Sequence, residues 1–184
     1  MSVALSGDTL AVGAYKEDGC STSATGNNIN NNDCSDAGAA YVYTRSGTTW
    51  SLQAYVKAPN AEAGDLFGWS VALSGDTLAV GASGEDSCST SVSGTAATDN
   101  SCSSAGAVYV YTRSGTTWSF QAYVKAPNAE ASDGFGSSVA LSGDTLNTLA
   151  VGGNGEDSCS TSVSGTAATD NDCSDAGAVY VYTR

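Results

Sequence analysis

Residues 70–82 read Ser-Val-Ala-Leu-Ser-Gly-Asp-Thr-Leu-Ala-Val-Gly-Ala, and this stretch decides the fold because the chain contains it three times. It stands first at residues 2–14, and it returns from Ser138 with a three-residue insertion inside residues 146–149. The first two copies start 68 residues apart. A unit of this length that recurs in tandem indicates a supersecondary block that buries its faces against neighbouring copies.

The period divides the chain into repeat 1 (residues 1–66), repeat 2 (67–134) and repeat 3 (135–184). Repeat 1 lacks the Phe-Gly that opens the other two, and repeat 3 lacks the segment that follows Arg113 in repeat 2. We therefore expect about 2.7 repeats, cut from a longer repeat protein or completed by another molecule. Function is expected to reside in the array of repeats.

The composition excludes some partners. The 184 residues include 19 acids, 6 bases and no histidine, which gives a net charge of -13. This charge repels phosphate, so nucleic acid and anionic membranes are not expected as partners. No apolar run approaches the length of a membrane span, so no membrane insertion is expected. Five of the six cations recur in register, and we interpret them as solvated strand ends: Arg45, Arg113, Arg184, Lys57 and Lys125.

Six cysteines form three pairs, each separated by 14 positions: Cys20 and Cys34, Cys88 and Cys102, Cys159 and Cys173. This repeated spacing predicts a disulfide inside each repeat, because any other pairing would treat equivalent loops differently. Zinc is the competing interpretation, but without histidine or a Cys-x-x-Cys spacing its ligands would have to come from different repeats. Disulfides predict an oxidising compartment, so we expect the chain outside the cell or at its surface.

Repeat 2 has the pattern of four strands, which are rich in β-branched and aromatic residues and cover residues 68–74, 76–82, 106–113 and 117–126. Residues 74–76 predict a tight hairpin between the first two strands, and the cysteine-containing loop joins the second to the third. The first three strands are apolar or small on both faces, as in sheets covered on both sides.

The fourth strand has an alternating pattern that predicts one buried and one exposed face. Trp118, Phe120, Ala122 and Val124 would lie on the first, and Ser119, Gln121, Tyr123 and Lys125 on the second. Such a strand fits the outer rim of a propeller blade. The expected fold is all-β: tandem four-stranded antiparallel blades of β-propeller type, incomplete as a closed propeller.

The opening of repeat 2 resembles a known family. Residues 67–72, Phe-Gly-Trp-Ser-Val-Ala, followed by Val80-Gly81-Ala82, resemble the FG-GAP repeat, the blade of the integrin α-subunit propeller and of many bacterial surface and secreted proteins. Repeat 3 keeps Phe135-Gly136 but reads Val151-Gly152-Gly153. The resemblance implies four-stranded sheets around an axis, an extracellular location and a role in binding or adhesion without catalysis.

Calcium is the one ion for which the sequence offers candidate ligands, and no other cofactor is expected. Several integrin-type blades carry a calcium loop between the first two strands, but this chain has only residues 73–77 there. A second candidate is the cysteine loop of repeat 3, whose oxygen ligands would be Glu156, Asp157, Asp170, Asp172 and Asp175. The corresponding acids are Glu17, Asp18, Asp33 and Asp36 in repeat 1, and Glu85, Asp86 and Asp99 in repeat 2. The alternative, favoured by the variable spacing, is that these acids solvate exposed loops.

Catalysis is not expected, because there is no histidine for a nucleophile system and the cysteines are oxidised. Paired carboxylates could hydrolyse glycosides, but the acids here lie in repeated loops or beside turns. Two non-catalytic functions are left. The first is adhesion or ligand binding through the cysteine loops (residues 15–36, 83–104 and 154–175), with a cell-surface protein or glycan as partner. The second is a structural subunit of an extracellular fibre or surface filament, which assembles with further repeats or with other copies of the chain.

Overall fold

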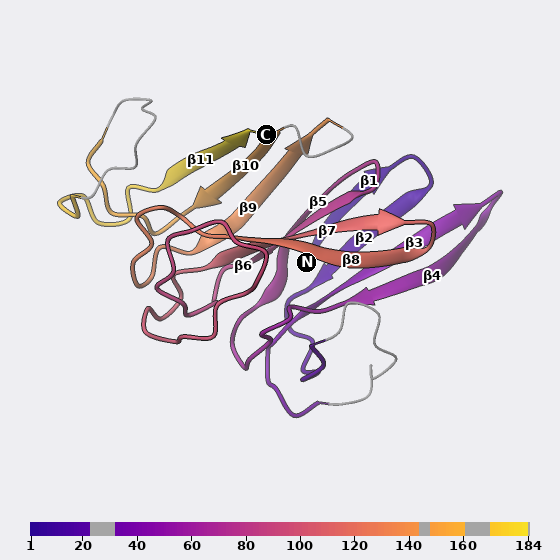
Figure 1. Ribbon diagram of the computed structural model, residues 1–184, viewed down its shortest axis with the longest axis horizontal. Coiled ribbons are helices and arrows are strands. Elements are labelled where there is room, and N and C mark those ends of the chain that lie inside the picture. The colour runs from indigo at the N-terminus through magenta and orange to yellow at the C-terminus, as the bar shows by residue number, and fades with distance from the viewer. Residues whose placement is uncertain (23–31, 144–147, 161–169, 184) are drawn as a thin grey trace.

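The computed structural model describes residues 1–184 except 23–31, 144–147, 161–169 and 184. Within the described residues, the regular structure consists of β-strands in three antiparallel sheets (Figure 1). The first sheet contains β1 (Ser2–Ser6), β2 (Thr9–Ala14), β3 (Ala39–Ser46) and β4 (Thr49–Val56). The second contains β5 (Phe67–Ser74), β6 (Thr77–Ala82), β7 (Ala107–Ser114) and β8 (Thr117–Val124). The third contains β9 (Phe135–Ser142), β10 (Thr148–Gly153) and β11 (Ala178–Thr183). The all-β prediction is thus confirmed.

Each sheet follows the order of the chain, and the register repeats from sheet to sheet. Val80 of β6 lies opposite Val71 of β5 on one side and Tyr109 of β7 on the other. In the first sheet, the corresponding pair is Val12 and Tyr41. Short hairpins join the first two strands of the first two sheets, as expected, and Gly75 supplies the positive φ of 53° that the β5–β6 turn requires.

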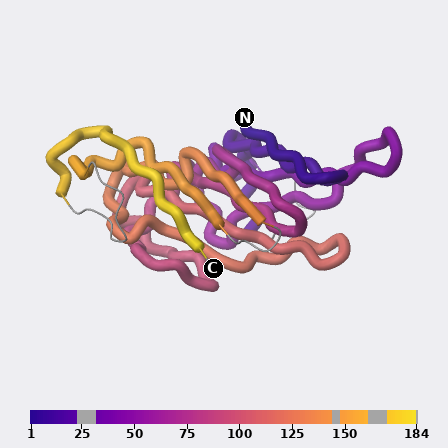
Figure 2. Tube along the Cα trace, turned by 90° about the horizontal axis from the view of Figure 1, so that it is seen from above, coloured from indigo at the N-terminus to yellow at the C-terminus, as the bar shows by residue number. Residues whose placement is uncertain are grey.

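The three sheets stack face to face. β5 packs on β1 and β2, and β9 packs on β5 and β6. Figure 2 shows the stack from above, with the indigo start of the first sheet on one side and yellow β11 on the other. Every sheet has a large-residue face and a small-residue face. In the second sheet, the large-residue face carries Val71, Leu73, Leu78, Val80, Tyr109, Tyr111 and Trp118, and the small-residue face carries Ala79, Val108, Val110 and Val124.

Both interfaces in the stack join unlike faces. The large-residue face of the second sheet packs on the small-residue face of the first, which consists of Ala11, Ala40, Val42, Ala54 and Val56. The small-residue face of the second sheet packs on Val139, Leu141, Leu149, Val151, Tyr180 and Tyr182 of the third. Bulky side chains therefore fill the space left by small ones, and the same interface occurs twice.

The expected alternation of the fourth strand is wrong beyond Phe120. Tyr111 lies opposite Phe120, whereas Val110 lies opposite Ala122, so Gln121 is an extra residue in β8. Such a β-bulge moves every later side chain to the other face. Tyr123 consequently joins Trp118 and Phe120 on the large-residue face, where its ring lies 5.3 Å from that of Tyr109, and it is fully buried.

The Phe-Gly pair that opens a repeat sits where two sheets come closest. Phe67 is buried, its N–H donates to the carbonyl of Ala37, and its ring packs edge-to-face with that of Tyr109, with the ring centroids 5.4 Å apart. Gly68 has φ of +89°, and a Cβ on it would lie 2.3 Å from the carbonyl oxygen of Ala39. Only glycine fits both this backbone conformation and this close approach.

Candidate functional site: the disulfide-closed loops

A disulfide closes the loop between the second and third strands of every repeat. The structure links Cys20 to Cys34, Cys88 to Cys102 and Cys159 to Cys173. The corresponding Cα–Cα distances are 5.1, 5.0 and 5.0 Å. The described residues contain no free cysteine. Each bridge joins the two ends of a polar loop, so the loop cannot open without breaking a covalent bond.

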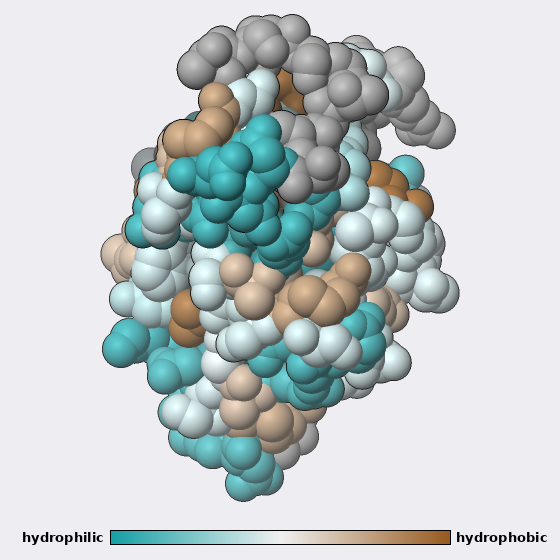
Figure 3. All heavy atoms as spheres, turned by 90° about the vertical axis from the view of Figure 1, so that its left-hand side faces the viewer, coloured by the Kyte–Doolittle hydropathy of each residue, from teal (hydrophilic) through white to brown (hydrophobic). Residues whose placement is uncertain are grey.

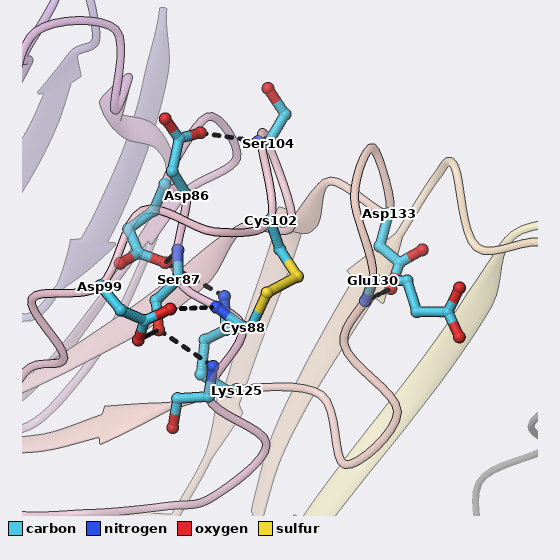
Figure 4. The surroundings of a disulfide bond; sticks show 11 residues. Asp86, Ser87, Cys88, Asp99, Cys102, Ser104, Lys125, Glu130 and Asp133 are labelled. Carbon is cyan, nitrogen blue, oxygen red and sulfur yellow. Dashed lines mark hydrogen bonds and ion pairs between the residues drawn. A yellow bond between two sulfur atoms is a disulfide. The ribbon is translucent and has the colours of Figure 1, made fainter.

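One aspartate organises the base of each loop. In repeat 2, the carbonyl of Asp86 accepts from the backbone N–H of Cys102 at 2.8 Å, and its Oδ1 accepts from the N–H of Ser104 at 2.7 Å (Figure 4). This second bond holds Ser104 in its left-handed conformation with φ of 54°. Asp18 and Asp157 make the same two contacts in the other repeats.

A second carboxylate holds the N-terminal end of the loop. Asp99 accepts from the backbone N–H of Cys88 at 2.9 Å and from the hydroxyl of Ser87 at 2.8 Å (Figure 4). These hydrogen bonds lower the pKa of Asp99, because they favour its charged form. Asp170 occupies the same place in repeat 3 and accepts from the N–H of Cys159 at 2.7 Å.

A buried ion pair lies beneath the loop base. Lys125 Nζ is 3.1 Å from Glu85 Oε2, and both side chains are almost fully buried. Burial lowers the pKa of Lys125, and the nearby Glu85 opposes this effect. Lys57 and Glu17 form the same contact in repeat 1, where Lys57 also donates to the carbonyl of Gly38. The expectation that these two lysines are solvated strand ends is therefore wrong.

The two lysines are buried because the loop base supplies acceptors for their ammonium groups: Glu17 and the carbonyl of Gly38 for Lys57, and Glu85 for Lys125. Each lysine directly follows the fourth strand, past the bulge. The other cations differ. Arg45 forms an exposed pair with Asp8, as expected of a strand end, and Arg113 is only partly exposed and pairs with Asp76. Arg184 lies outside the described residues.

The linker between repeats enters the loop base of the next repeat. Asn60 donates to the carbonyl of Ala97 at 2.8 Å and accepts from the hydroxyl of Tyr109 at 2.7 Å. Asn60 also donates to Glu85 at 3.3 Å, and Asn128 of the next linker makes the corresponding contacts, since it donates to Glu156 at 2.9 Å and accepts from Tyr180 at 2.8 Å. The loops of repeats 2 and 3 are thus each held by their own disulfide and by the linker that precedes their sheet.

Two buried aspartates belong to the same linkers. The carboxylate of Asp65 accepts from the N–H of Glu62 at 2.8 Å, and that of Asp133 accepts from the N–H of Glu130 at 2.7 Å. Burial raises the pKa of Asp65 to about 7 and that of Asp133 to about 6. Nearby acids such as Glu85 and Glu156 act in the same direction. Neither aspartate was singled out by the sequence as a candidate.

The five acids proposed as calcium ligands do not converge. Glu156 is buried and accepts from the N–H of Ser158, while Asp157 and Asp170 bind the backbone of the loop base as described above. Asp172 and Asp175 are exposed. Among the residues that the structure describes, no three acidic or cysteine side chains gather as metal ligands. The acids of the loop bases act as hydrogen-bond acceptors for the backbone, which is more than the solvation expected of them.

The candidate binding surface is the tip of each loop. In repeat 2, Glu85 and Ser87 at the base are buried, whereas most of residues 89–101 are exposed. Within this stretch, the backbone of Ser93 is held against the sheet, because it pairs with the backbone of Tyr123 in β8 through two hydrogen bonds of 2.9 and 2.8 Å. Much of the tips of the other two loops, residues 23–31 and 161–169, lies outside the described residues. The loop of repeat 2 therefore combines a fixed base with a polar, accessible tip.

Repeats of this construction define a class of propeller-blade proteins, and the comparison with protein families agrees. Residues 50–111 and 118–182 match the FG-GAP repeat family. The chain belongs to the FG-GAP repeat family. No curated protein matches the chain. No helix that is long and apolar enough to cross a membrane occurs among the described residues.

Proposed function

We propose that this chain is a non-catalytic extracellular scaffold that binds a partner through its disulfide-closed loops. The observation that carries the proposal is the contrast within a loop between base and tip. The disulfide and the two backbone contacts of the base aspartate are the same in every repeat, while the tip sequence changes from STSATGNNINNND in repeat 1 to STSVSGTAATDNS in repeat 2. Rigid elements that present variable loops are a common arrangement for recognition.

The disulfides and the family support the extracellular location. Disulfides persist in oxidising compartments and are rare in the cytosol. FG-GAP repeats together with three bridges fit a scaffold outside the cell. The acids at the loop bases accept hydrogen bonds from backbone N–H groups or pair with a buried lysine, so their role is to stabilise the loop bases. This use of the carboxylates favours a binding role over an enzymatic one.

The chemistry of the tips indicates a polar partner. The side of the molecule that carries the loops after β6 and β10 is mostly hydrophilic, with small hydrophobic patches (Figure 3). Hydroxyls, amides and carboxylates of the tips suit hydrogen bonding to a cell-surface protein or a glycan. The net charge of -13 disfavours nucleic acid and anionic lipid.

Attachment of coated beads to intact cells tests this function. The test variant carries Ala at Thr90, Ser91 and Thr98, all exposed on the loop of repeat 2, and at the counterparts in repeat 3. The control carries Ala at Ser114, Thr116 and Thr117, which are exposed at the opposite hairpin tip. We expect the test variant to lose attachment and the control to keep it. Equal attachment of both variants would overturn the proposal.

A second function, self-assembly, is favoured by the two open faces of the stack. Val3 and Leu5 on the large-residue face of the first sheet are 60% and 64% exposed, whereas their counterparts Val71 and Leu73 are 6% and 9% exposed. On the small-residue face of the third sheet, Val179 and Val181 are exposed, although the matching Val108 and Val110 are fully buried.

These two open faces are complementary, because the stack already joins a large-residue face to a small-residue face twice. A second copy can repeat that contact head to tail, which gives a ring or a filament. Sedimentation at increasing concentration tests this: the wild-type chain should associate, and Val181→Asp should stay monomeric. Thr116→Asp, at an exposed turn, is the matched control and should associate normally. A wild-type chain that stays monomeric would contradict self-assembly.

A further inference from the structure

A single carboxylate in the interior of the second repeat contacts both an amine and a carboxamide. Oε2 of Glu85 lies 3.1 Å from Nζ of Lys125, and its Oε1 accepts from Nδ2 of Asn60 at 3.3 Å. Asn60 belongs to the linker before β5, and Lys125 directly follows β8. A carboxamide that precedes the second sheet in the chain and an amine that follows it therefore meet at one acid.

The other contacts of Asn60 orient its amide. Nδ2 also donates to the carbonyl of Ala97 at 2.8 Å, and this contact identifies the nitrogen, because a backbone carbonyl can only accept. Oδ1 accepts from the hydroxyl of Tyr109 at 2.7 Å. A donor at this oxygen stabilises the negative charge that develops there when a nucleophile attacks Cγ. The amide thus has a polarised carbonyl, and its nitrogen lies beside an acid.

The surroundings of Lys125 favour its neutral, nucleophilic form. The side chain is fully buried, and burial lowers the pKa of this lysine because the ammonium group loses its hydration. Glu85 is 2% exposed, so transfer of a proton from the ammonium to the carboxylate removes two charges from an almost dry site. Tyr109 is fully buried as well, so little water reaches the amide to compete with the amine.

We propose that Lys125 and Asn60 join in an intramolecular isopeptide bond, with Glu85 as the proton carrier. The structure describes the chain before this reaction. Glu85 takes one proton from Lys125, and the flexible four-carbon stem of the lysine brings the neutral Nζ from the carboxylate to the amide beside it.

The reaction exchanges one bond to Cγ of Asn60 for another. A bond forms between Nζ and Cγ, and the bond between Cγ and Nδ2 breaks. Glu85 gives its proton to Nδ2 and receives the second proton of the attacking nitrogen, so ammonia leaves and Glu85 ends protonated. The buried pair of charges becomes a neutral amide beside a neutral acid, and the exchange consumes no oxidant or cofactor.

The new bond closes the second repeat covalently. Because it joins the linker before β5 to the residue after β8, it encloses all four strands of the sheet together with the Cys88–Cys102 bridge. A pulling force on the chain then passes from one linker to the next through the bond and bypasses the sheet. This role in mechanical strength is separate from recognition by the loop tips.

Mass spectrometry of the intact, folded chain tests the proposal. We expect a mass lower by one ammonia than that of the chain with its disulfides alone. After reduction, trypsin should leave residues 58–113 joined to residues 114–184, because Lys125 in an amide linkage is not cleaved. Fragmentation should place the bond between Asn60 and Lys125. A chain of full mass, or a loss of ammonia without a joined peptide, would overturn the proposal.

Two asparagine variants form a matched pair. Asn60→Ala removes the reacting amide and should abolish the joined peptide. Asn128→Ala removes the equivalent amide of the next linker, so the joined peptide should form as in the wild type. Circular dichroism verifies that both variants are folded. A joined peptide in Asn60→Ala would show that another residue supplies the carbonyl and would contradict the assignment.

Two further variants test the roles of the groups around the amide, with the joined fraction measured at a fixed time after purification. Glu85→Gln removes the proton carrier and should lower this fraction at least about tenfold. Tyr109→Phe keeps the ring but removes the donor to Oδ1, and it should also lower the fraction at least about tenfold. Tyr109→Phe leaves the ion pair intact, so it tests the reaction even if Glu85→Gln does not fold. A wild-type yield in folded Tyr109→Phe or Glu85→Gln would contradict the mechanism.

Discussion

Lys125 Nζ lies 3.1 Å from Glu85 Oε2 in the interior of the second repeat, with the lysine side chain fully buried and the glutamate 2% exposed. The glutamate follows β6 and begins the disulfide loop, and the lysine follows β8 at the outer edge of the sheet. The ion pair therefore connects the start of the loop, which follows β6, to the end of β8, two strands away in the same sheet. Lys57 and Glu17 do the same in the first repeat.

Removal of one partner of this pair should be costly. We expect Lys125→Met to lower the free energy of unfolding by about 3–5 kcal/mol, because Glu85 is then buried without its partner. The double variant Lys125→Met/Glu85→Gln should recover much of that loss. As a control, Arg45→Met, which breaks the exposed pair with Asp8, should cost less than about 1 kcal/mol. Urea unfolding measures all three, and a Lys125→Met variant as stable as the control would contradict the buried pair.

The glycine of the Phe-Gly pair should tolerate no side chain. Gly136 has φ of +90°, and a Cβ there would lie 2.5 Å from the carbonyl oxygen of Ala107 in the neighbouring sheet. Gly115 also has a positive φ, +62°, but nothing lies within 4 Å of a Cβ built on it. Gly136→Ala should therefore destabilise the chain by at least ~2 kcal/mol more than Gly115→Ala. Equal unfolding midpoints in urea would show that the sheets are not in close contact there.

The stability of the chain should fall between about pH 4 and pH 7 through Asp65. Its pKa is about 7 in the folded chain, against an ordinary value of 3.8, so the folded state keeps a proton that the unfolded state has lost. The contribution is complete below the unfolded pKa and is lost as the pH rises through the folded pKa, up to roughly 4 kcal/mol in all. Asp133, with a pKa of about 6, acts in the same direction.

Asp65→Asn isolates this contribution, because the amide oxygen can still accept the hydrogen bond from Glu62. Urea midpoints at pH 5 and pH 8 should differ less in this variant than in the wild type, and at pH 8 the variant should be at least as stable. Asp172→Asn, at an exposed position, controls for the change in net charge. An unchanged pH slope in Asp65→Asn would show that this carboxyl does not hold a proton near neutral pH.

The sequence predicted the features that depend on periodicity. Residues 70–82 recur with their glycines and β-branched residues, so the strands, the tight hairpins and the antiparallel order were accessible without a structure. The cysteine spacing likewise led to the pairing that the structure contains. What could not be predicted was the effect of a single residue, Gln121. A bulge leaves no signature in an alternating pattern, yet it reverses the faces of Ala122 and Tyr123.

The chemistry at the loop bases was harder to predict than the strands. A lysine after an exposed-looking strand is usually solvated, and the burial of Lys57 and Lys125 depends on contacts with Glu17 and Glu85, 40 residues earlier in each case. Recurrence of both residues at the repeat period was the available signal. The sequence signal for the burial of Asp65 was weaker, because this residue comes close to Glu85 only when the linker folds against the next sheet.

Every repeat carries its own covalently closed loop on a stack of blades, and we propose that this stack lies outside the cell. Peptide mapping without reduction, on protein isolated from its native source, tests this most directly. We expect three linked peptide pairs, joining Cys20 to Cys34, Cys88 to Cys102 and Cys159 to Cys173, and no free thiol. Free cysteines, or bridges between different repeats, would contradict both the loop architecture and the extracellular assignment.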